Sequence, residues 1–302
     1  MQFPVRMKKI AAMSAVALSL AQPAFAAQQV AAPSPTRLYP DSRLVYTDRI
    51  SVEIVGKGPD LVLIPGLSSS RETWRRTADR LRGHYRLHLV QIDGFAGEPA
   101  QANAAGPVFD PVAEAIGAYL GKFGHPVPVV GHSLGGTLGL AIAERHPGLI
   151  SKLMLVDSLP FFGVVFAGPD ATPDSLRPMA TAMKSQMSAP MPDAMARQMA
   201  AQMISAPEDV ARLLGWMKAS DPAVVGTAMT DDMLTDLRPG VARVAIAVTV
   251  VHETALGDAV KSGYAKLPAG TLVEVPGAKH FIMYDQPARF DSALDAFLGA
   301  GG

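Results

Sequence analysis

The chain contains no cysteine among its 302 residues. This absence excludes disulfide bridges, thiolate metal ligands, a cysteine nucleophile and a lipid-modified N-terminal cysteine. The chain also lacks an excess of either charge, because 27 Lys and Arg residues balance 27 Asp and Glu residues. It has no basic run and no interleaving of basic with aromatic residues, which argues against a nucleic-acid partner.

Apolar runs long enough to anchor the chain in a membrane are also missing. The longest N-terminal one, residues 10–20, follows Arg6, Lys8 and Lys9 and precedes small residues around Ala26. This order is typical of a cleaved secretory signal peptide. We therefore predict a signal peptide over residues 1–26, a flexible leader over residues 27–40, and export to the periplasm or the medium of a bacterium.

The remaining sequence alternates apolar, strand-like runs with amphipathic, helix-like segments at intervals of about 30 residues. Such alternation predicts an α/β fold with a mostly parallel sheet covered by helices on both faces. Between residues 159 and 238 the alternation stops, and the sequence there is helical by spacing and rich in Pro and Met. We predict a core domain over residues 41–158 and 239–302, and a helical cap inserted over residues 159–238.

Two predicted helices carry local start signals. Ser69 and Glu72 fit a capping box for the helix that ends at Leu81. Asp110 and Pro111 fit the N-cap and the first helical residue of a later helix.

The predicted cap carries a stripe of methionines at every fourth residue, which Pro190 and Pro192 must interrupt. Two interpretations of the stripe stay open: flexible side chains that fill a core, or an adaptable apolar lining for a substrate tunnel. The stripe consists of Met179, Met183, Met187, Met191, Met195, Met199 and Met203.

The segment from Val127 to Ile142 contains a serine between two glycines, in the order Gly131-His132-Ser133-Leu134-Gly135. An apolar strand precedes this motif and a helix-like run follows it. A serine in such a sharp strand-to-helix turn is held in strained backbone angles, with its hydroxyl clear of the sheet. The N-terminus of the next helix stabilises negative charge at the same place. The motif therefore predicts a nucleophile.

A serine nucleophile needs a base, most often histidine. His280 is the best candidate, because it follows the last predicted strand, at the carboxyl edge where open α/β sheets gather their catalytic groups. His132 adjoins the serine, so strand alternation predicts that its side chain points away and has a structural role. No pair of histidines has a spacing that suggests a metal site.

The order of these motifs resembles the α/β-hydrolase superfamily over about residues 50–300, in the branch with a serine nucleophile and a helical cap. The resemblance implies that Ser133 is the nucleophile, that His280 is the base, and that the backbone N–H groups of Leu67 and Leu134 form the oxyanion hole. The residues that carry it are Pro65-Gly66, Asp93-Gly94-Phe95, Gly131-His132-Ser133-Leu134-Gly135-Gly136 and His280-Phe281.

The acid of the triad is where this sequence departs from the family. Members usually carry an Asp in the loop after the strand that follows the cap, and here that loop has alanine at the expected place. Some relatives place the acid one strand earlier, which corresponds to Asp157. We expect Asp157 to be the acid, with Glu253 and Asp258 as alternatives.

These residues predict a serine hydrolase that cleaves an ester-like bond through an acyl-enzyme, without a cofactor. Phe161, Phe162 and the methionines of the cap predict a small to medium apolar substrate. The alternatives are a hydrolase of lactones, thioesters or carbon–carbon bonds, or a binding protein that has lost catalysis. The oligomeric state is left open.

Overall fold

The computed structural model describes residues 37–189 and 191–299, which form part of one compact unit, Pro33–Gly302. The predicted signal peptide and most of the predicted leader lie outside the described residues. Among the described residues, no helix is long and apolar enough to span a membrane.

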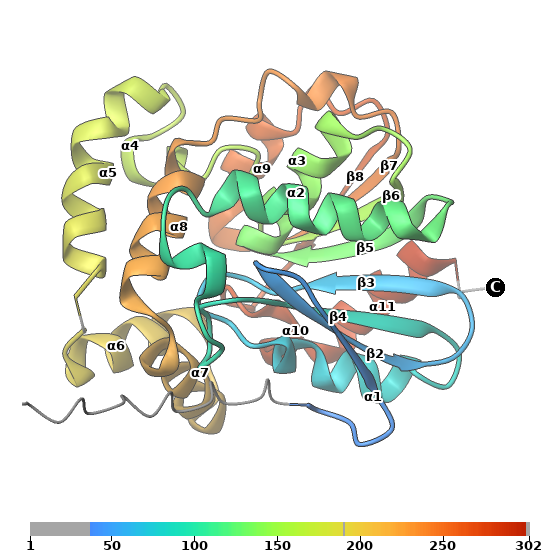
Figure 1. Cartoon of the computed structure of the whole chain (residues 1–302). Coiled ribbons are helices and arrows are strands. Elements are labelled where there is room, and N and C mark those ends of the chain that lie inside the picture. The colour runs from blue at the N-terminus through green and yellow to red at the C-terminus, as the bar shows by residue number, and fades with distance from the viewer. Residues whose placement is uncertain (1–36, 190, 300–302) are drawn as a thin grey trace, which may run out of the picture. The chain divides into compact units, whose positions relative to one another are not determined.

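The core is one eight-stranded sheet in the order β1-β2-β4-β3-β5-β6-β7-β8 (Figure 1). The strands β3 to β8 are all parallel to one another. Near one edge, β2 pairs antiparallel with β4 and with the edge strand β1. The predicted mostly parallel sheet is confirmed. The strands are β1 Arg43–Tyr46, β2 Ile50–Gly56, β3 Asp60–Ile64, β4 Arg86–Ile92, β5 Val127–His132, β6 Ile150–Val156, β7 Ala247–Glu253 and β8 Gly270–Val275.

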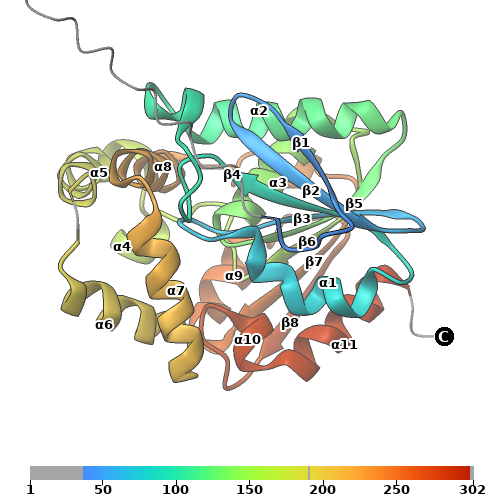
Figure 2. The same cartoon turned by 60° about the horizontal axis from the view of Figure 1, so that its bottom comes forward.

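Helices cover both faces of this sheet (Figure 2), because alternate residues of its buried strands point to opposite sides. In β3, Val62 and Ile64 pack in the cluster that includes α2 and α3, while Leu61 and Leu63 pack in the cluster of α1 and α11. The helices of the core are α1 Arg75–Leu81, α2 Phe109–Leu120, α3 Leu134–Arg145, α9 Gly257–Gly263, α10 Ile282–Asp285 and α11 Pro287–Leu298.

Five further helices lie between β6 and β7 in the chain, with no strand among the described residues of this segment. They gather beyond the end of the sheet toward which β3 points (Figure 1). The methionine stripe is divided as predicted, since one helix ends at Met187 and the next begins after Pro192. The five are α4 Val164–Ala167, α5 Pro173–Met187, α6 Asp193–Met203, α7 Pro207–Ala219 and α8 Pro222–Leu234.

Both predicted helix caps are wrong in detail. Ser70, rather than Ser69, accepts a hydrogen bond from the N–H of Glu72, and a short 3-10 turn precedes α1. The helix α2 begins one residue before Asp110, since the N–H groups at its start donate to the Asp231 carboxylate, at 2.7 Å from Val108. Because Asp231 lies on α8, this cap has no local sequence signal.

Candidate active site

Ser133 occupies a strained turn between β5 and α3, with φ 51° and ψ −122°. Only small residues fit on either side of it. A Cβ atom on Gly131 would lie 2.3 Å from the carbonyl oxygen of Gly135, and a Cβ on Gly135 would lie 2.4 Å from that of Ile64. The two glycines therefore allow the strand, the helix and the neighbouring β3 to meet closely beneath the serine.

Asp157 follows the end of β6 and is hydrogen-bonded to His280, which follows β8. The two atoms, Asp157 Oδ2 and His280 Nδ1, lie 2.7 Å apart, and the Asp157 side chain is completely buried. The other carboxylate oxygen accepts the backbone N–H of Glu253 at 2.9 Å. A carboxylate that accepts the Nδ1 proton of His280 leaves Nε2 free to act as a base.

Within the part of the chain that the structure describes, neither alternative acid is hydrogen-bonded to His280. Among the described residues, the Glu253 side chain makes no hydrogen bond to His280, and only the backbone of Glu253 supports the pair by holding Asp157. Burial, followed by the neighbouring charge of Asp157, raises the pKa of the Glu253 carboxyl. Asp258 borders a separate cavity that none of Ser133, His280 and Asp157 borders. The structure thus brings Asp157, and neither alternative, to His280.

Ser133 and His280 border one cavity of about 560 Å³. Within the described residues, no hydrogen bond joins the two side chains. In unliganded enzymes, catalytic hydrogen bonds of this kind are often long and tighten when substrate binds. The loop that carries His280 is held to the cap, because the N–H of Phe281 donates to the carbonyl of Met203 at the end of α6, at 3.1 Å.

The two expected oxyanion donors flank the serine. Leu134 is the first residue of α3, so its N–H has no acceptor within its own helix. Leu67 borders the same cavity as Ser133, in the loop after β3. A Cβ atom on the preceding Gly66 would lie 3.2 Å from the Cβ of Ser133, which shows how closely this loop passes the nucleophile.

The predicted orientation of His132 is wrong, although its structural role agrees with the contacts. Its ring is fully buried, borders the cavity and packs against the rings of His280 and Phe281, with centroids 4.7 and 4.6 Å away. Burial, with a smaller contribution from the charge of His280, keeps the pKa of His132 well below its usual range. The neutral ring donates from Nε2 to the backbone carbonyl of His280 at 3.0 Å.

Methionines from the predicted stripe form the largest group of residues in the cavity wall. Six of the seven border it, and Met179, which does not, is 43 % exposed. The tunnel-lining interpretation therefore describes this stripe better than core filling does. The six are Met183, Met187, Met191, Met195, Met199 and Met203.

The two phenylalanines expected to contact substrate have different places. Phe162 borders the cavity beside Phe166, with their rings 5.2 Å apart in an edge-to-face arrangement. Phe161 does not border it. Its ring is buried against Met233 and lies 4.4 Å below the guanidinium of Arg238. Adjacent residues of this turn point to opposite sides, so only one of the two rings reaches the cavity.

The wall residues that sequence reasoning missed include Met229 and Asp232, both on α8. Asp232 is 6 % exposed, and burial raises the pKa of its carboxyl to about 7 despite a hydrogen bond with Thr137 that lowers it. The sequence spacing could have grouped these two residues, because Val225, Met229 and Asp232 fall on one face of a helix.

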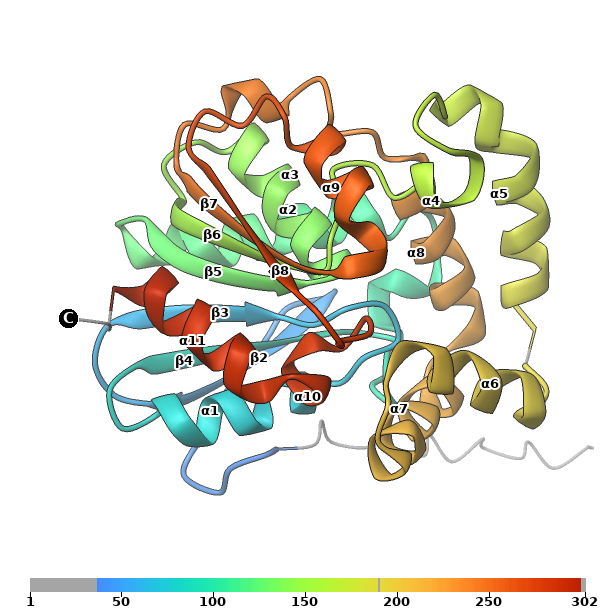
Figure 3. The same cartoon turned by 180° about the vertical axis from the view of Figure 1, so that it is seen from behind.

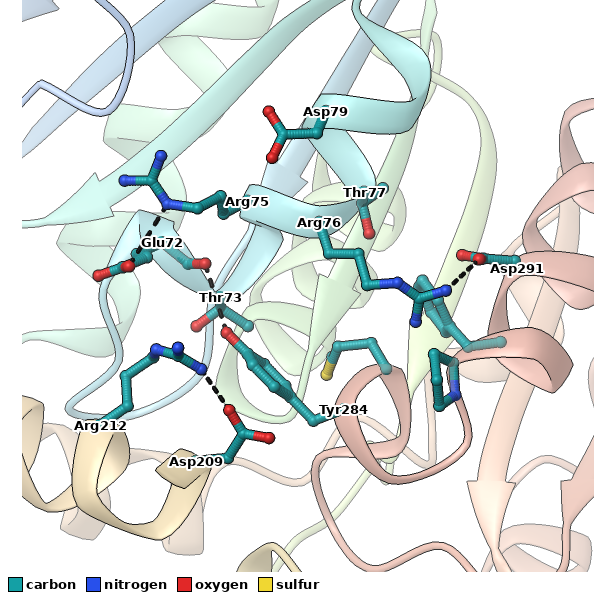
Figure 4. Close-up of a pocket in the computed structure, with 13 residues that line it drawn as sticks. Glu72, Thr73, Arg75, Arg76, Thr77, Asp79, Asp209, Arg212, Tyr284 and Asp291 are labelled. Carbon is teal, nitrogen blue, oxygen red and sulfur yellow. Dashed lines mark hydrogen bonds and ion pairs between the residues drawn. The ribbon is translucent and has the colours of Figure 1, made fainter. Parts of the chain in front are cut away.

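A separate cleft of about 430 Å³ is lined by charged side chains of α1, α7 and α11, with Glu72 before α1 (Figure 4). Its charges are largely paired: Arg76 contacts Asp291 at 2.8 Å, and Arg212 contacts Asp209. None of Ser133, His280 and Asp157 borders it. Across residues 37–189 and 191–299, no group of three His, Asp or Glu side chains is arranged to hold a metal ion.

The chain belongs to the alpha/beta hydrolase family, whose sequence profile matches residues 61–293. The expected fold and family are confirmed, and so is the expected class of enzyme, a serine hydrolase of the esterase type.

Named relatives agree with this class. The chain is 28 % identical to the pimeloyl-acyl-carrier-protein methyl ester esterase of Nitrosomonas europaea, over 82 % of this chain and 98 % of that protein. It is also 28 % identical to the enzyme of that name from Aeromonas salmonicida, over 83 % of this chain and 99 % of the other. Among solved structures, a hydrolase from Pseudomonas aeruginosa matches with a TM-score of 0.70 at 20 % identity, covering 86 % of this chain and 99 % of that one.

Proposed function

We propose that the chain hydrolyses carboxylic esters with small to medium apolar groups through an acyl-enzyme on Ser133. The observation that carries this proposal is the 2.7 Å hydrogen bond between Asp157 and His280 at the edge of a cavity that Ser133 also borders. The esterase names of the relatives support the bond type.

In the proposed mechanism, Ser133 Oγ attacks the ester carbonyl carbon while His280 Nε2 takes the hydroxyl proton. The N–H groups of Leu67 and Leu134 hold the oxyanion, and Asp157 stabilises the imidazolium. The carbon–oxygen bond to the alcohol then breaks, and His280 gives its proton to the leaving oxygen. A water molecule, deprotonated by His280, attacks the acyl-enzyme, so the acid leaves and Ser133 regains its proton.

The cavity supports an apolar substrate. Apolar side chains, among them seven methionines and Phe162, form most of its wall, and Asp232 is the one carboxyl group among its described lining residues. Since burial raises the pKa of that carboxyl to about 7, it carries little negative charge below neutral pH. A substrate with a strongly charged group near the ester would lose its hydration there without a partner of opposite charge.

The test is to compare the purified chain with Ser133→Ala, using a fluorophosphonate probe and p-nitrophenyl esters of increasing acyl length. We expect labelling and turnover in the parent and neither in the variant. A folded parent that is not labelled and turns over no ester would overturn the proposal and favour the binding-protein alternative.

We also propose export of the chain, on the strength of the signal-peptide pattern in residues 1–26. When the full chain is expressed in a bacterium, we expect the periplasmic or secreted protein to begin at residue 27. Accumulation of the uncleaved chain in the cytoplasm would contradict this proposal.

A further inference from the structure

A second apolar cavity, of about 330 Å³, adjoins the catalytic cavity. We call it the side cavity, and it is bordered by Ala196, Leu213, Met217 and Val225 among others. These residues come from α6, α7 and α8 of the cap, of which α6 and α7 pack against each other (Figures 1 and 3).

Five residues border both cavities, so the two cavities share part of their wall. They are Leu67, Met187, Met191, Met199 and Met203. Four of the five are methionines, whose unbranched and flexible side chains move aside at small cost. A chain-like ligand can therefore pass from one cavity into the other.

The far part of the side cavity carries one ion pair, between Lys218 and Asp193, at 2.8 Å. Both side chains are largely exposed, which places this pair at the solvent side of the cavity. The wall between the pair and the methionines is mainly apolar, and it includes Leu213 and Val225. A hydrocarbon chain fits such a wall better than a polar group does.

The position of His280 distinguishes the two limbs of an ester. The leaving alcohol must face His280, because His280 protonates it in the proposed mechanism. His280 borders the catalytic cavity and not the side cavity. Leu67 borders both, and its N–H is expected to hold the oxygen of the acyl carbonyl. The limb that extends past Leu67, away from His280, is therefore the acyl chain.

We propose that the side cavity binds the far end of a medium-to-long acyl chain, which reaches it between the four methionines. This inference rests on the proposed esterase function. It extends the substrate class from small and medium acyl groups to linear acyl chains that fill both cavities in turn.

Chain-length dependence tests the proposal. Each methylene buried in an apolar site raises kcat/KM about fourfold, so the rise with acyl length continues while the chain still enters the cavity. A larger side chain introduced into the side cavity takes the place of the end of a long acyl chain. The rise of kcat/KM then stops at a shorter acyl length. If it excludes four methylenes, the longest esters lose about 200-fold in kcat/KM, while the shortest are unchanged.

The experiment compares the parent chain with Ala196→Phe and Val225→Phe, which fill the side cavity from α6 and from α8. The matched control is Ala211→Phe, on the exposed face of α7 and at the border of neither cavity. Each protein is assayed with p-nitrophenyl esters of two to sixteen carbons and with alkyl butanoates of increasing alcohol length. Thermal unfolding identifies any variant that does not fold.

We expect both filled variants to lose long acyl esters selectively, and the control to match the parent. Filled, folded variants whose acyl-length profile matches the parent would overturn the inference while leaving the esterase function intact. A selective loss of long alcohols would overturn the assignment to the acyl limb. Absence of turnover for all esters in the parent would instead refute the proposed function itself.

Discussion

Replacing Asp157 by Asn tests the acid of the proposed triad. The amide has nearly the shape of the carboxylate, and its oxygen can still accept the N–H of Glu253, so we expect the fold to persist. The substitution removes the negative charge of a completely buried carboxylate, whose Oδ2 atom lies 2.7 Å from His280 Nδ1.

The size of the effect follows from the charge that forms during catalysis. When His280 takes the serine proton, the imidazolium and the Asp157 carboxylate attract each other by about 4 kcal/mol, for charge centres about 4 Å apart in surroundings with an effective dielectric constant of about 20. This corresponds to a factor of about 10³. The amide also favours the wrong tautomer of His280, and such replacements in other triads lower kcat by about 10⁴. We expect a loss of about 10³- to 10⁴-fold in kcat, with KM little changed.

The assay is steady-state hydrolysis of a p-nitrophenyl ester, with circular dichroism to establish folding. Glu253→Gln is the matched control, because it keeps the backbone N–H that holds Asp157 and changes a carboxylate that is not bonded to His280. We expect this control to stay within about tenfold of the parent, since its charge acts on His280 only at longer range. Near-normal activity of Asp157→Asn together with loss of activity in Glu253→Gln would refute the assignment of the acid.

Three further substitutions test the packing around the site. Because burial raises the pKa of Asp232 to about 7, the folded state holds a proton that the unfolded state releases near pH 4, and its stability falls between these values as pH rises. Asp232→Asn should therefore raise Tm more at pH 8 than at pH 5, and an equal change at both would contradict this. Gly135→Ala, whose new Cβ would lie 2.4 Å from a backbone oxygen of β3, should prevent stable folding, while Gly83→Ala, with open space around it, should not, as thermal unfolding would show. Arg71→Met removes the buried cation beside Glu53, whose carboxylate keeps its hydrogen bonds from Leu38, Tyr39 and Ser42, and should cost about 3 kcal/mol in urea unfolding, whereas a change below about 1 kcal/mol would show that the pair contributes little.

The sequence was a good guide to the sheet, because its strands are short apolar runs bounded by turns. All five residues of β3 are buried, for example, and its pattern is clear without any tertiary information. The strand that sequence reasoning missed is β1, at the edge of the sheet, where no residue of Arg43–Tyr46 is fully buried. An edge strand with an exposed face lacks the apolar run that marks a central one.

Sequence reasoning located Ser133 and His280 because Ser133 follows directly on a predicted strand and His280 lies in the loop after one. It did not predict two features that depend on contacts between distant parts of the chain. Asp231 caps α2 from more than 100 residues away, and Phe161 and Phe162 differ only in which side of a turn they face. Neither result has a local signal, since both are fixed by how the cap packs on the core.

Tertiary structure also decides which of the candidate acids reaches His280. The arrangement of the sheet explains why an acid after β6 can replace an acid after β7. The strands β6 and β7 are neighbours, and paired strands lie about 4.8 Å apart. The backbone at the end of β7 holds Asp157 twice, because Val251 accepts its N–H at 2.7 Å and Glu253 donates to its carboxylate at 2.9 Å. Asp157 itself has φ 49°, which turns its side chain out of the β6 direction. A carboxylate that starts on β6 is thus carried to the end of β7, where it meets His280 without an acid in the loop that follows.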